Sequence, residues 1–315
     1  MGADRTHILV LNYNGRALLG ECLPSIVEAA ERSPVPCALS VVDNGSTDDS
    51  LAYLANHWPN INVIREPNLG LASFNSVLAR LDVPTVLLLN NDVKLAPHAI
   101  APLLDAIANH PDALFSAPLC FTFDGLEYEG MRTRVRTRFG MVQGLSRVPG
   151  VEKLLNLPDL TAAAGPVLAV DRLKFLALGG YDPLFFPGRI EDLDLGFRGW
   201  MAGFKGYYVP SSLAYHKGFA SFGPAFGPAR CDHLAARNTL IFAWKNLSGR
   251  RLLQHLAWLP LRILYTLARG RPDFAKALWA ALARLGPILA ERKALAVGQG
   301  TWKTRQESYF HQFRF

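Results

Sequence analysis

Four short apolar runs alternate with four helical stretches in the first 110 residues, and this alternation restricts the fold more than any other feature. Apolar side chains recur every three or four residues in the stretches, which is typical of amphipathic helices. The runs lie at residues 7–11, 38–42, 61–64 and 83–89, and the helical stretches at 16–32, 46–58, 70–81 and 96–110. Strands separated by helices predict βαβ units and a parallel sheet covered on both faces. We therefore expect an α/β fold.

Polar turns follow three of the four apolar runs. They comprise residues 12–15 (Asn-Tyr-Asn-Gly), 43–46 (Asp-Asn-Gly-Ser) and 90–92 (Asn-Asn-Asp). Ligands of open parallel sheets bind at the carboxyl ends of the strands, so these turns are expected to border one crevice. Asn and Asp also favour ordinary turns, which is the alternative for each of them. Ser46 or Thr47 is also expected to cap the helix that follows.

The alternation fails after residue 121. Residues 131–139 place arginine at every second position, which predicts an extended strand with one cationic face. That face is either solvated or turned toward an anionic acceptor. A helix is expected again over residues 189–203, followed by short strands at 205–210 and 213–218.

The C-terminal part of the chain differs in composition from the rest. Residues 235–315 hold 14 Lys and Arg against 3 Asp and Glu, or +11, which leaves 19 against 23, or −4, for residues 1–234. No stretch there reaches 18 apolar residues without a charge, so interfacial amphipathic helices are favoured over a transmembrane span. A soluble helical bundle is the alternative. We therefore divide the chain into an α/β domain (1–234) and a basic helical region (235–315) that is expected to contact a membrane surface.

Other features restrict the class of protein and its compartment. The four cysteines are far apart and include no Cys-x-x-Cys pair, which indicates neither a disulfide framework nor a zinc site. A reducing, cytosolic setting is therefore expected. The apolar run near the N-terminus is too short for a signal peptide. The basic residues accompany no nucleic-acid-binding motif, so nucleic acid is not an expected partner.

Seven sequence blocks, taken in order, resemble the family 2 glycosyltransferases, which have the GT-A fold. The blocks are VLNYNG (10–15), VVDNGSTDDS (41–50), EPNLGLASFN (66–75), LLLNNDV (87–93), AAAGPVLAVDR with GGYDPLFF (162–172 and 179–186), EDLDLGFRGWMAGFKGYYVP (191–210) and AYHKG (214–218). The resemblance covers about residues 6–245 and is greatest to bacterial rhamnosyltransferase-like members. It implies a GT-A domain with a mixed, mainly parallel sheet, followed by basic amphipathic helices.

The resemblance also implies a metal-dependent reaction. Asp92 would supply a carboxylate that holds Mg²⁺ or Mn²⁺, and His216 would be the second protein ligand. Such a metal neutralises the charge that develops on a diphosphate leaving group. The family's usual motif is Asp-x-Asp, and here Asn90 takes its first position. Because an amide is a weaker ligand than a carboxylate, Asn90 and Asn91 are expected to bind the sugar nucleotide instead.

The catalytic base is assigned by the same resemblance. Asp192 occupies the position of the carboxylate that removes a proton from the acceptor hydroxyl, and inversion needs only this one base. Glu191 and Asp194 are the rival candidates for the base. Alternatively, Glu191 would orient the acceptor or the base, and Asp194 would form a helical ion pair with Arg198 four residues later. Acids in the first turn of a helix are also favoured by the helix dipole. Arg237 is expected to reach the donor diphosphate or a lipid phosphate, and a plain surface arginine is the alternative.

The remaining candidate residues belong to the nucleotide. Asp43 would accept the imide N–H of uracil or thymine, while Asn12 and Tyr13 would line the base and the ribose. Asn68 and Gly70 come from the next family block, where Gly70 permits a close backbone approach to the ligand.

These residues predict an inverting glycosyltransferase. It would move a sugar from dTDP-rhamnose or a UDP-sugar to a hydroxyl of a saccharide or lipid-linked saccharide in cell-surface glycan synthesis. The cationic tail predicts a peripheral contact with an anionic membrane, at the inner face of the cell membrane. The alternatives are a non-catalytic protein that binds sugar nucleotides or lipids on the same fold, and a membrane-surface scaffold. A nucleotidyltransferase would need a Gly-rich, Lys-bearing loop after the first strand, and residues 12–20 do not form one.

Overall fold

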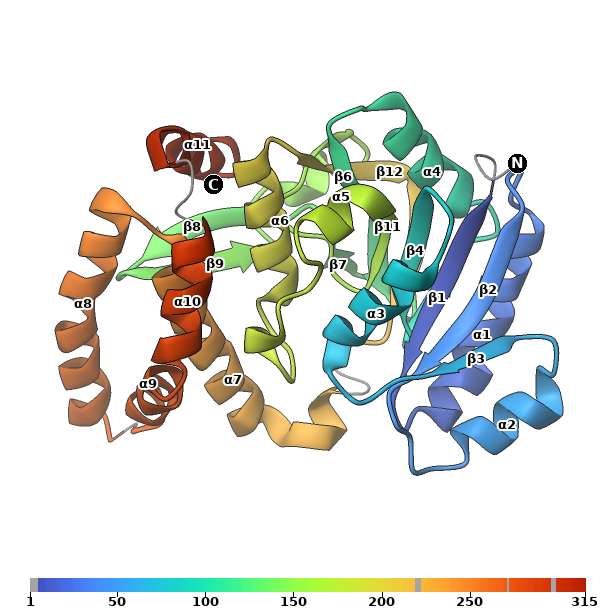
Figure 1. Ribbon diagram of the computed structural model, residues 1–315, viewed down its shortest axis with the longest axis horizontal. Helices are drawn as coiled ribbons and strands as arrows, with labels where there is room; N and C mark the ends of the chain where they lie inside the picture. Colours follow the sequence, from blue (N-terminus) through green and yellow to red (C-terminus); the bar gives the residue numbers. More distant parts are fainter. Residues whose placement is uncertain (1–4, 219–221, 271, 296–298) are drawn as a thin grey trace.

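A twisted sheet with its helices forms one half of the molecule, and a group of C-terminal helices forms the other (Figure 1). The computed structural model describes residues 5–218, 222–270, 272–295 and 299–315. The first elements along the chain are β1 (Thr6–Asn12), α1 (Arg16–Glu31), β2 (Cys37–Asp43), α2 (Ser50–His57), β3 (Asn62–Arg65), η1 (Gly70–Ala72), α3 (Ser73–Arg80), β4 (Thr85–Asn90), β5 (Val93–Leu95) and α4 (Ile100–Asn109). The predicted alternation of strands and helices is confirmed for this part of the chain.

The central sheet is mixed and mainly parallel, as expected. Its later elements are β6 (Ala113–Thr122), β7 (Tyr128–Gly130), β10 (Asp159–Leu160), β11 (Val167–Asp171) and β12 (Lys205–His216). The strand order is β10-β12-β6-β11-β4-β1-β2-β3, with β5 paired to β12 and β7 to β6. β1 runs parallel to β2 and β4, whereas β11 is antiparallel between β4 and β6. Asn12 is in register with Asp43 and Leu11 with Asn90, so three strand ends meet at one edge.

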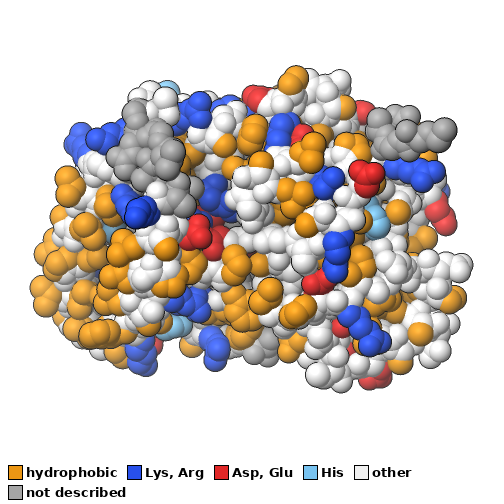
Figure 2. Space-filling view, viewed as in Figure 1, with side chains coloured by type: hydrophobic (Ala, Val, Ile, Leu, Met, Phe, Trp, Pro, Cys, Tyr) orange, Lys and Arg blue, Asp and Glu red, His pale blue; other side chains and the backbone are white. Residues whose placement is uncertain are grey.

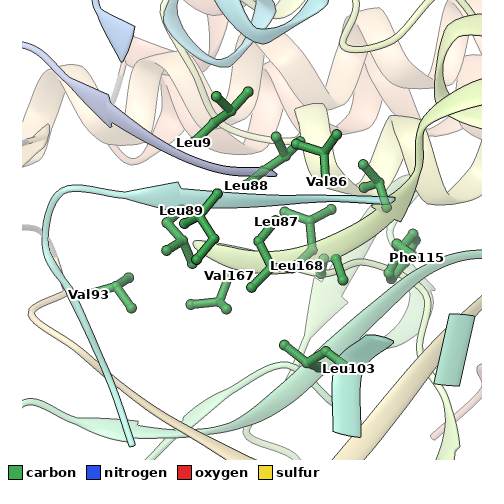
Figure 3. Packing of buried hydrophobic residues seen from close by; sticks show 14 of the residues in the cluster. Leu9, Val86, Leu87, Leu88, Leu89, Val93, Leu103, Phe115, Val167 and Leu168 are labelled. Atoms are coloured by element: carbon green, nitrogen blue, oxygen red, sulfur yellow. The ribbon is translucent and has the colours of Figure 1, made fainter. Parts of the chain in front are cut away.

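The core explains why β4 contains three consecutive leucines. Leu87, Leu88 and Leu89 are each at most 1% exposed, and they pack between Leu9 of β1 and Val167 of β11 (Figure 3). A strand covered on both faces needs an unbroken apolar run, and burying each such side chain contributes roughly 1.5–3 kcal/mol. After this buried run, polar residues therefore occur at positions 90–92, where the chain leaves the core.

The helix after β2 begins later than expected. α2 begins at Ser50, whose backbone N–H donates to Asp48 Oδ1 (3.1 Å). The Ser46 hydroxyl accepts hydrogen bonds from the backbone N–H of Asn14 and the side-chain amide of Asn12. The prediction that Ser46 or Thr47 caps this helix is wrong, because Ser46 holds the turn after β1 instead.

The arginine-rich strand is only partly solvated. It forms β8 (Arg134–Arg138), which pairs antiparallel with β9 (Met141–Leu145). The side chains of Arg132 and Arg134 are 7% and 11% exposed, and both form ion pairs with Asp159. The solvated-face interpretation is wrong for these two residues, because a buried guanidinium needs a compensating charge. Arg138, near the tip of the hairpin, is exposed.

The helix α6 (Glu191–Ala202) lies between the α/β half of the molecule and the C-terminal helices in Figure 1. The C-terminal helices are α7 (Phe222–Asn246), α8 (Gly249–Ala268), α9 (Asp273–Leu282), α10 (Leu285–Leu295) and α11 (Gln299–Gln312). The ring of Phe197 in α6 makes edge contacts with Phe242 of α7 (centroids 5.4 Å apart) and Tyr309 of α11 (5.0 Å). α6 thereby belongs to a second hydrophobic core that α7 and α11 complete. α7 runs through residue 234, where the sequence suggested a domain boundary.

Within the described ranges, none of the helices combines the length and the apolar content that crossing a bilayer requires.

Candidate active site

Buried polar side chains join the ends of β1, β2 and β4. Asn91 Nδ2 donates to Asn12 Oδ1 (2.8 Å), and Asn12 Nδ2 donates to Asp43 Oδ1 (3.3 Å). All three side chains are at most 4% exposed. Gly15 passes so close to this chain of hydrogen bonds that a Cβ atom there would lie 1.9 Å from Asn91 Nδ2. The three predicted residues therefore form one rigid polar edge, while Tyr13 beside them is 44% exposed and accessible to a ligand.

Asp92 and His216 are adjacent, although 124 positions separate them in the sequence. β5 pairs with the end of β12, and this brings His216 Nε2 to 3.4 Å from Asp92 Oδ1. The other ring nitrogen, Nδ1, lies 3.2 Å from Glu129 Oε1 of β7. Burial would lower the pKa of His216, but the hydrogen bonds to Asp92 and Glu129 outweigh it and raise that pKa to about 9. The imidazole is therefore protonated at neutral pH in this state.

The donor set around Asp92 fits a divalent metal that the substrate helps to bind. Among the residues that the structure describes, no group of three or more His, Cys, Asp or Glu could hold a metal ion by itself. Mg²⁺ commonly takes only one or two protein ligands and completes its coordination with substrate phosphates and water. A carboxylate on the second ring nitrogen is also how metal-binding histidines are usually oriented, and Glu129 occupies that place. Sequence reasoning missed Glu129.

Glu191 and Asp192 begin α6 and keep part of their surface exposed. Burial raises the pKa of Asp192 to about 7, and a hydrogen bond from the Tyr181 hydroxyl to Asp192 Oδ1 (3.2 Å) opposes part of that shift. Burial, followed by the charge of Asp192, raises the pKa of Glu191 to about 8. A carboxyl with a pKa near 7 can take up and release a proton at physiological pH, which is what a general base needs.

A small pocket lies next to these carboxyls. One wall is the segment after β3, and the other is the segment that leads into α6. The lining residues are Leu69, Leu71, Ala72, Tyr181, Asp182, Phe185, Phe186, Pro187, Gly188 and Glu191. Glu191 Oε2 is buried without a hydrogen-bond partner among the described residues, so the pocket side of α6 carries an unsatisfied acceptor. A hydroxyl group placed in the pocket would satisfy it.

Gly70 lies where the two walls of this pocket approach each other closely through the backbone of Pro187. Its φ of 61° is a conformation that favours glycine, and a Cβ atom there would lie 3.0 Å from the carbonyl oxygen of Pro187. Asn44 Nδ2 donates to the Gly70 carbonyl (3.1 Å), and the Gly70 N–H donates to the exposed Asn68 side chain (3.2 Å). Gly70 therefore lies between Asn44, which follows β2, and the segment that leads into α6. Asn90, at the end of β4, is half-buried.

Arg237 and Asn238 of α7 hold the segment that precedes α6. Arg189 and Ile190 in this segment have φ values of 79° and 77°, and such backbone strain costs about 1–3 kcal/mol per residue. Asn238 Nδ2 lies 2.8 Å from the carbonyl oxygens of Phe185, Gly188 and Arg189, and Arg237 Nη2 donates to Phe186 O (2.6 Å).

The expected contact of Arg237 with a phosphate stays a prediction. The alternative of a plain surface arginine is wrong, because Arg237 is buried and its guanidinium binds the segment before α6. The exposed fraction of Arg237 is 7%. The sequence did not identify Asn238 as a functional residue. The available signal was a single amide before the apolar run Leu240–Ala243.

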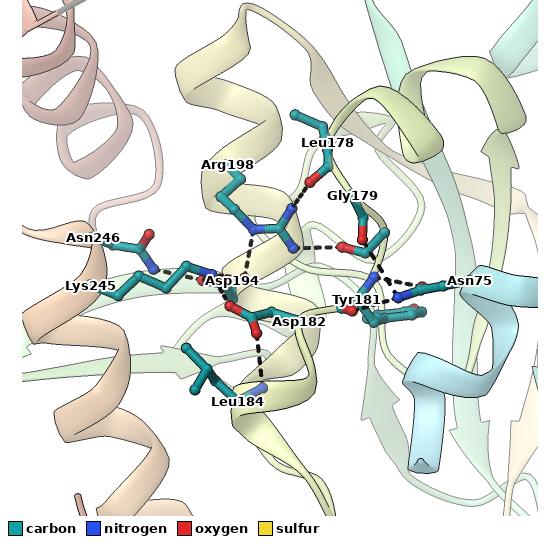
Figure 4. Close-up of polar contacts among 11 residues, drawn as sticks. Asn75, Leu178, Gly179, Tyr181, Asp182, Leu184, Asp194, Arg198, Lys245 and Asn246 are labelled. Carbon is teal, nitrogen blue, oxygen red and sulfur yellow. Dashed lines mark hydrogen bonds and ion pairs between the residues drawn. The ribbon is translucent and has the colours of Figure 1, made fainter. Parts of the chain in front are cut away.

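Asp194 belongs to a buried ionic network rather than to the pocket (Figure 4). It is 0% exposed and pairs with Arg198 Nε (2.7 Å), Lys245 Nζ (3.0 Å) and Asn246 Nδ2 (2.7 Å). The interpretation of Asp194 as the partner of Arg198 is confirmed. Lys245 also pairs with Asp182, so the network connects α6, α7 and the pocket wall.

Comparisons with known proteins show which family the chain resembles. The sequence model described as glycosyl transferase family 2 matches residues 7–159. A Mycobacterium tuberculosis protein named N-acetylglucosaminyl-diphospho-decaprenol L-rhamnosyltransferase is 30% identical over 277 residues, which cover 78% of this chain and 86% of that protein. The putative polypeptide N-acetylgalactosaminyltransferase 10 of Drosophila melanogaster is 25% identical over 219 residues, or 64% of this chain and 34% of that protein.

Solved structures show the same fold at low sequence identity. The mannosyltransferase PcManGT of Pyrobaculum calidifontis, in complex with GDP-Man and Mn²⁺, has a TM-score of 0.54 at 20% identity and covers 98% of this chain and 86% of its own. The S. aureus protein TarS (residues 1–349), in complex with UDP-GlcNAc, has a TM-score of 0.53 at 14% identity. The match covers 98% of this chain and 91% of the TarS chain. The fold is therefore GT-A.

Proposed function

Because this chain belongs to glycosyl transferase family 2, we propose that it transfers a sugar from a nucleotide diphosphate to an acceptor hydroxyl with inversion at the anomeric carbon. The observation that carries the proposal is the contact of Asp92 with His216, next to the buried strand-edge group of Asn12, Asp43 and Asn91. This arrangement would hold a diphosphate beside a nucleoside.

At the nucleoside end, the Asp43 carboxylate would accept the imide N–H of thymine or uracil. Asn12 and Asn91 fix the position of that carboxylate through their hydrogen bonds, and the exposed ring of Tyr13 is available to the base and the ribose. Asn68, Asn90 and the backbone around Gly70 would contact the ribose and the sugar.

Asp92 and His216 would hold Mg²⁺ or Mn²⁺, and the metal would act as a Lewis acid on the diphosphate. Glu129 accepts the second N–H of His216 and so fixes the direction in which Nε2 points. The ring must lose its extra proton before Nε2 can bind a metal, so metal binding releases a proton.

The transfer itself requires one base. The acceptor oxygen forms a bond to the anomeric carbon, the bond from that carbon to the diphosphate breaks with its electron pair on the diphosphate, and Asp192 takes the proton of the hydroxyl. Glu191 lines the pocket and would orient the acceptor hydroxyl through its unsatisfied oxygen.

For the substrates, we propose dTDP-rhamnose as the donor, then a UDP-sugar, and a lipid-linked saccharide as the acceptor. The mycobacterial relative supports both choices, since its name specifies an L-rhamnosyl donor group and a diphospho-decaprenol acceptor. An acceptor of this kind lies in a membrane, so we also propose that the enzyme works in the cytoplasm at the inner face of the cell membrane and contributes to cell-surface glycans.

A thermal-shift panel tests the donor and the metal together. The purified protein would be melted with dTDP-rhamnose, UDP-GlcNAc and GDP-Man, each with and without Mn²⁺ or Mg²⁺. A ligand at 100 times its Kd stabilises the folded state by about 2.7 kcal/mol. We expect a rise in Tm with one donor, only with metal, and loss of that rise in Asp92→Asn.

The matched control is Asp105→Asn, which changes an exposed carboxylate on α4. It should respond to the donor as the wild type does. No stabilisation by any donor, or equal stabilisation of the wild type and Asp92→Asn, would contradict the proposed function.

A further inference from the structure

Apart from Gln254, the exposed side chains of α8 between Leu252 and Ala268 are apolar. Its exposed large side chains are 39–67% accessible and comprise Leu253, Leu256, Trp258, Leu261, Leu264, Tyr265 and Leu267. Between Leu252 and Ala268 the sole charged residue is Arg262, which is half-buried with its guanidinium 4.9 Å from the ring centroid of Phe274. A helix on the surface of a soluble protein normally turns its polar side outward, so the orientation of α8 is inverted.

Tertiary contacts fix this orientation. Trp244 Nε1 donates to Nε2 of the buried His255 (3.0 Å), and His255 Nδ1 in turn donates to the carbonyl of Gly140 (2.6 Å). Gly140 has no room for a side chain, since a Cβ atom there would lie 2.6 Å from Trp258 Cβ. These contacts lock α8 against α7 and the β8–β9 hairpin, so its apolar side cannot rotate inward.

The tip of the hairpin extends the same surface. Phe139 is 51% exposed, and its ring contacts Trp258 edge to face (centroids 5.2 Å apart). We call Phe139 and the seven exposed side chains of α8 the apolar face. Hydrophobic atoms gather over α8 and the neighbouring α9 at the lower left of Figure 2. Such a contiguous apolar patch on a protein surface generally marks a docking site.

The charges around the apolar face are positive. Arg250 and Arg269 are exposed at the two ends of α8, and Arg138 is exposed beside Phe139. Residues 235–315 carry a net charge of +11, with acids only at Asp273, Glu291 and Glu307, and Glu307 pairs with Arg251. A second copy of the chain on this face would bring two cationic surfaces together, whereas an anionic surface is complementary to it.

We propose that the apolar face docks on an anionic phospholipid bilayer. α8 lies parallel to the bilayer plane, with its leucines and Trp258 at the boundary between headgroups and acyl chains, while Arg138, Arg250 and Arg269 contact lipid phosphates. This inference deepens the proposed function, since a lipid-linked acceptor lies in the same bilayer, and docking would hold the pocket near that acceptor.

Vesicle co-sedimentation with the full chain tests the inference. The probes are vesicles of phosphatidylglycerol with phosphatidylcholine, and vesicles of phosphatidylcholine alone. We expect binding to the anionic vesicles that weakens as salt is added. The double variant Leu261→Glu and Leu264→Glu should bind them at least tenfold more weakly, because it places carboxylates in the centre of the apolar face.

The matched control is Leu173→Glu, which changes a leucine that is 66% exposed on α5 (Arg172–Ala177), in the α/β part. It should bind vesicles as the wild type does.

The Tm rise produced by the donor nucleotide is measured on the wild type, the double variant and the Leu173→Glu control. Lost vesicle binding with an unchanged donor response supports the docking face separately from the active site, and vesicle binding without any donor response supports docking while the proposed function fails.

Two results would overturn the inference. One is that the wild-type chain does not bind anionic vesicles, or that the double variant binds them as well as the wild type does. The other is a concentration-dependent dimer in light scattering that the double substitution abolishes, because the face would then be covered by a second copy.

Discussion

At the level of single residues, burial raises the pKa of the Asp192 carboxyl, which would take the proton. Asp192 accepts a hydrogen bond from Tyr181, whose ring is 1% exposed and packs edge to face on Phe175. Desolvation alone favours the neutral carboxyl, and the hydroxyl donor favours the charged one. The balance between the two leaves the pKa of Asp192 at about 7.

A pH profile checks this balance. A base must be deprotonated to act, so kcat/KM should rise with pH and reach half its maximum near pH 7, where Asp192 loses its proton. Tyr181→Phe keeps the ring but removes the donor, which raises the pKa of Asp192 further and moves the rise to higher pH. Tyr207→Phe, which removes a hydroxyl bound to Asp112 (2.8 Å) outside the pocket, should leave the profile unchanged. A profile that is the same in all three proteins would exclude Asp192 as the titrating group.

Asn238 is a positioning residue of the same region. Its amide nitrogen lies within hydrogen-bond distance of three carbonyl oxygens of the strained segment before α6. In Asn238→Ala these buried acceptors lose their donor, which should lower the free energy of unfolding by about 2 kcal/mol. Because the segment leads directly into Glu191 and Asp192 at the start of α6, kcat should fall by about tenfold or more, as happens when a catalytic group is misplaced.

The variant Asn238→Asp separates hydrogen bonding from packing. It keeps the size of the side chain but presents an acceptor to three carbonyl oxygens, so it should be at least as harmful as the alanine variant. Urea denaturation and steady-state kinetics measure both effects. An aspartate that is tolerated better than alanine would show that only volume matters at this position.

At the element scale, α6 is held by close packing and by ions. Gly196 packs so closely on the segment between β10 and β11 that a Cβ atom there would lie 2.0 Å from the carbonyl oxygen of Ala162. On its other side, Asp194 binds Arg198 of the same helix and Lys245 of α7. Lys245 also reaches Asp182 in the pocket wall (Figure 4). The ammonium group of Lys245 on α7 therefore binds two carboxylates that lie 63 and 51 positions earlier in the sequence.

Removing that ammonium group should be costly. In Lys245→Met two carboxylates lose a buried counterion, and breaking such a pair costs about 3–5 kcal/mol. Urea denaturation should show a lower midpoint with an unchanged slope. The control Lys276→Met breaks an exposed pair with Asp273 and should change the stability by less than about 0.5 kcal/mol. Equal effects of the two variants would contradict the role of the network.

At the scale of the whole molecule, the two hydrophobic cores share α6. α11 packs on the side of α6 away from the pocket: Trp200 Nε1 donates to the Arg305 carbonyl (3.1 Å), and its ring meets Phe313 (centroids 5.2 Å apart). Leu240 to Ala243 of α7 are completely buried in the same core. The helix that carries the candidate base therefore depends on the C-terminal region for one side of its packing.

A truncated chain tests this dependence. Removing residues 248–315 takes α8 to α11 away and exposes aromatic side chains that are buried around Phe197 and Trp200. The shortened chain should lose its cooperative thermal transition and its near-UV circular dichroism, because large apolar areas would face water. Removing only residues 314 and 315 leaves Phe313 in place and should preserve both signals. A truncated chain that melts cooperatively would show that the α/β part folds by itself.

Several features of this protein follow from the sequence alone. Periodic apolar residues and turn chemistry are local properties, so they predicted β1 to β4, the helices between them and α6. The parallel order of these strands then brought Asn12, Asp43 and Asn91 to one edge, because the ends of parallel strands coincide. Resemblance to the family placed Asp92 and His216 together, and the structure brings them to 3.4 Å.

Only the tertiary structure decided the contacts between distant segments. Glu129 and His216 are 87 positions apart, and Asn238 lies 53 positions from Phe185, so no local pattern relates them. Arg132 and Arg134 were identified as one side of a strand, but Asp159, which forms ion pairs with both, comes from another strand. In α8 the sequence determines that one side is apolar. Whether that side faces the core or the surroundings depends on what the other side binds, and His255, held by Trp244 and Gly140, turns it outward.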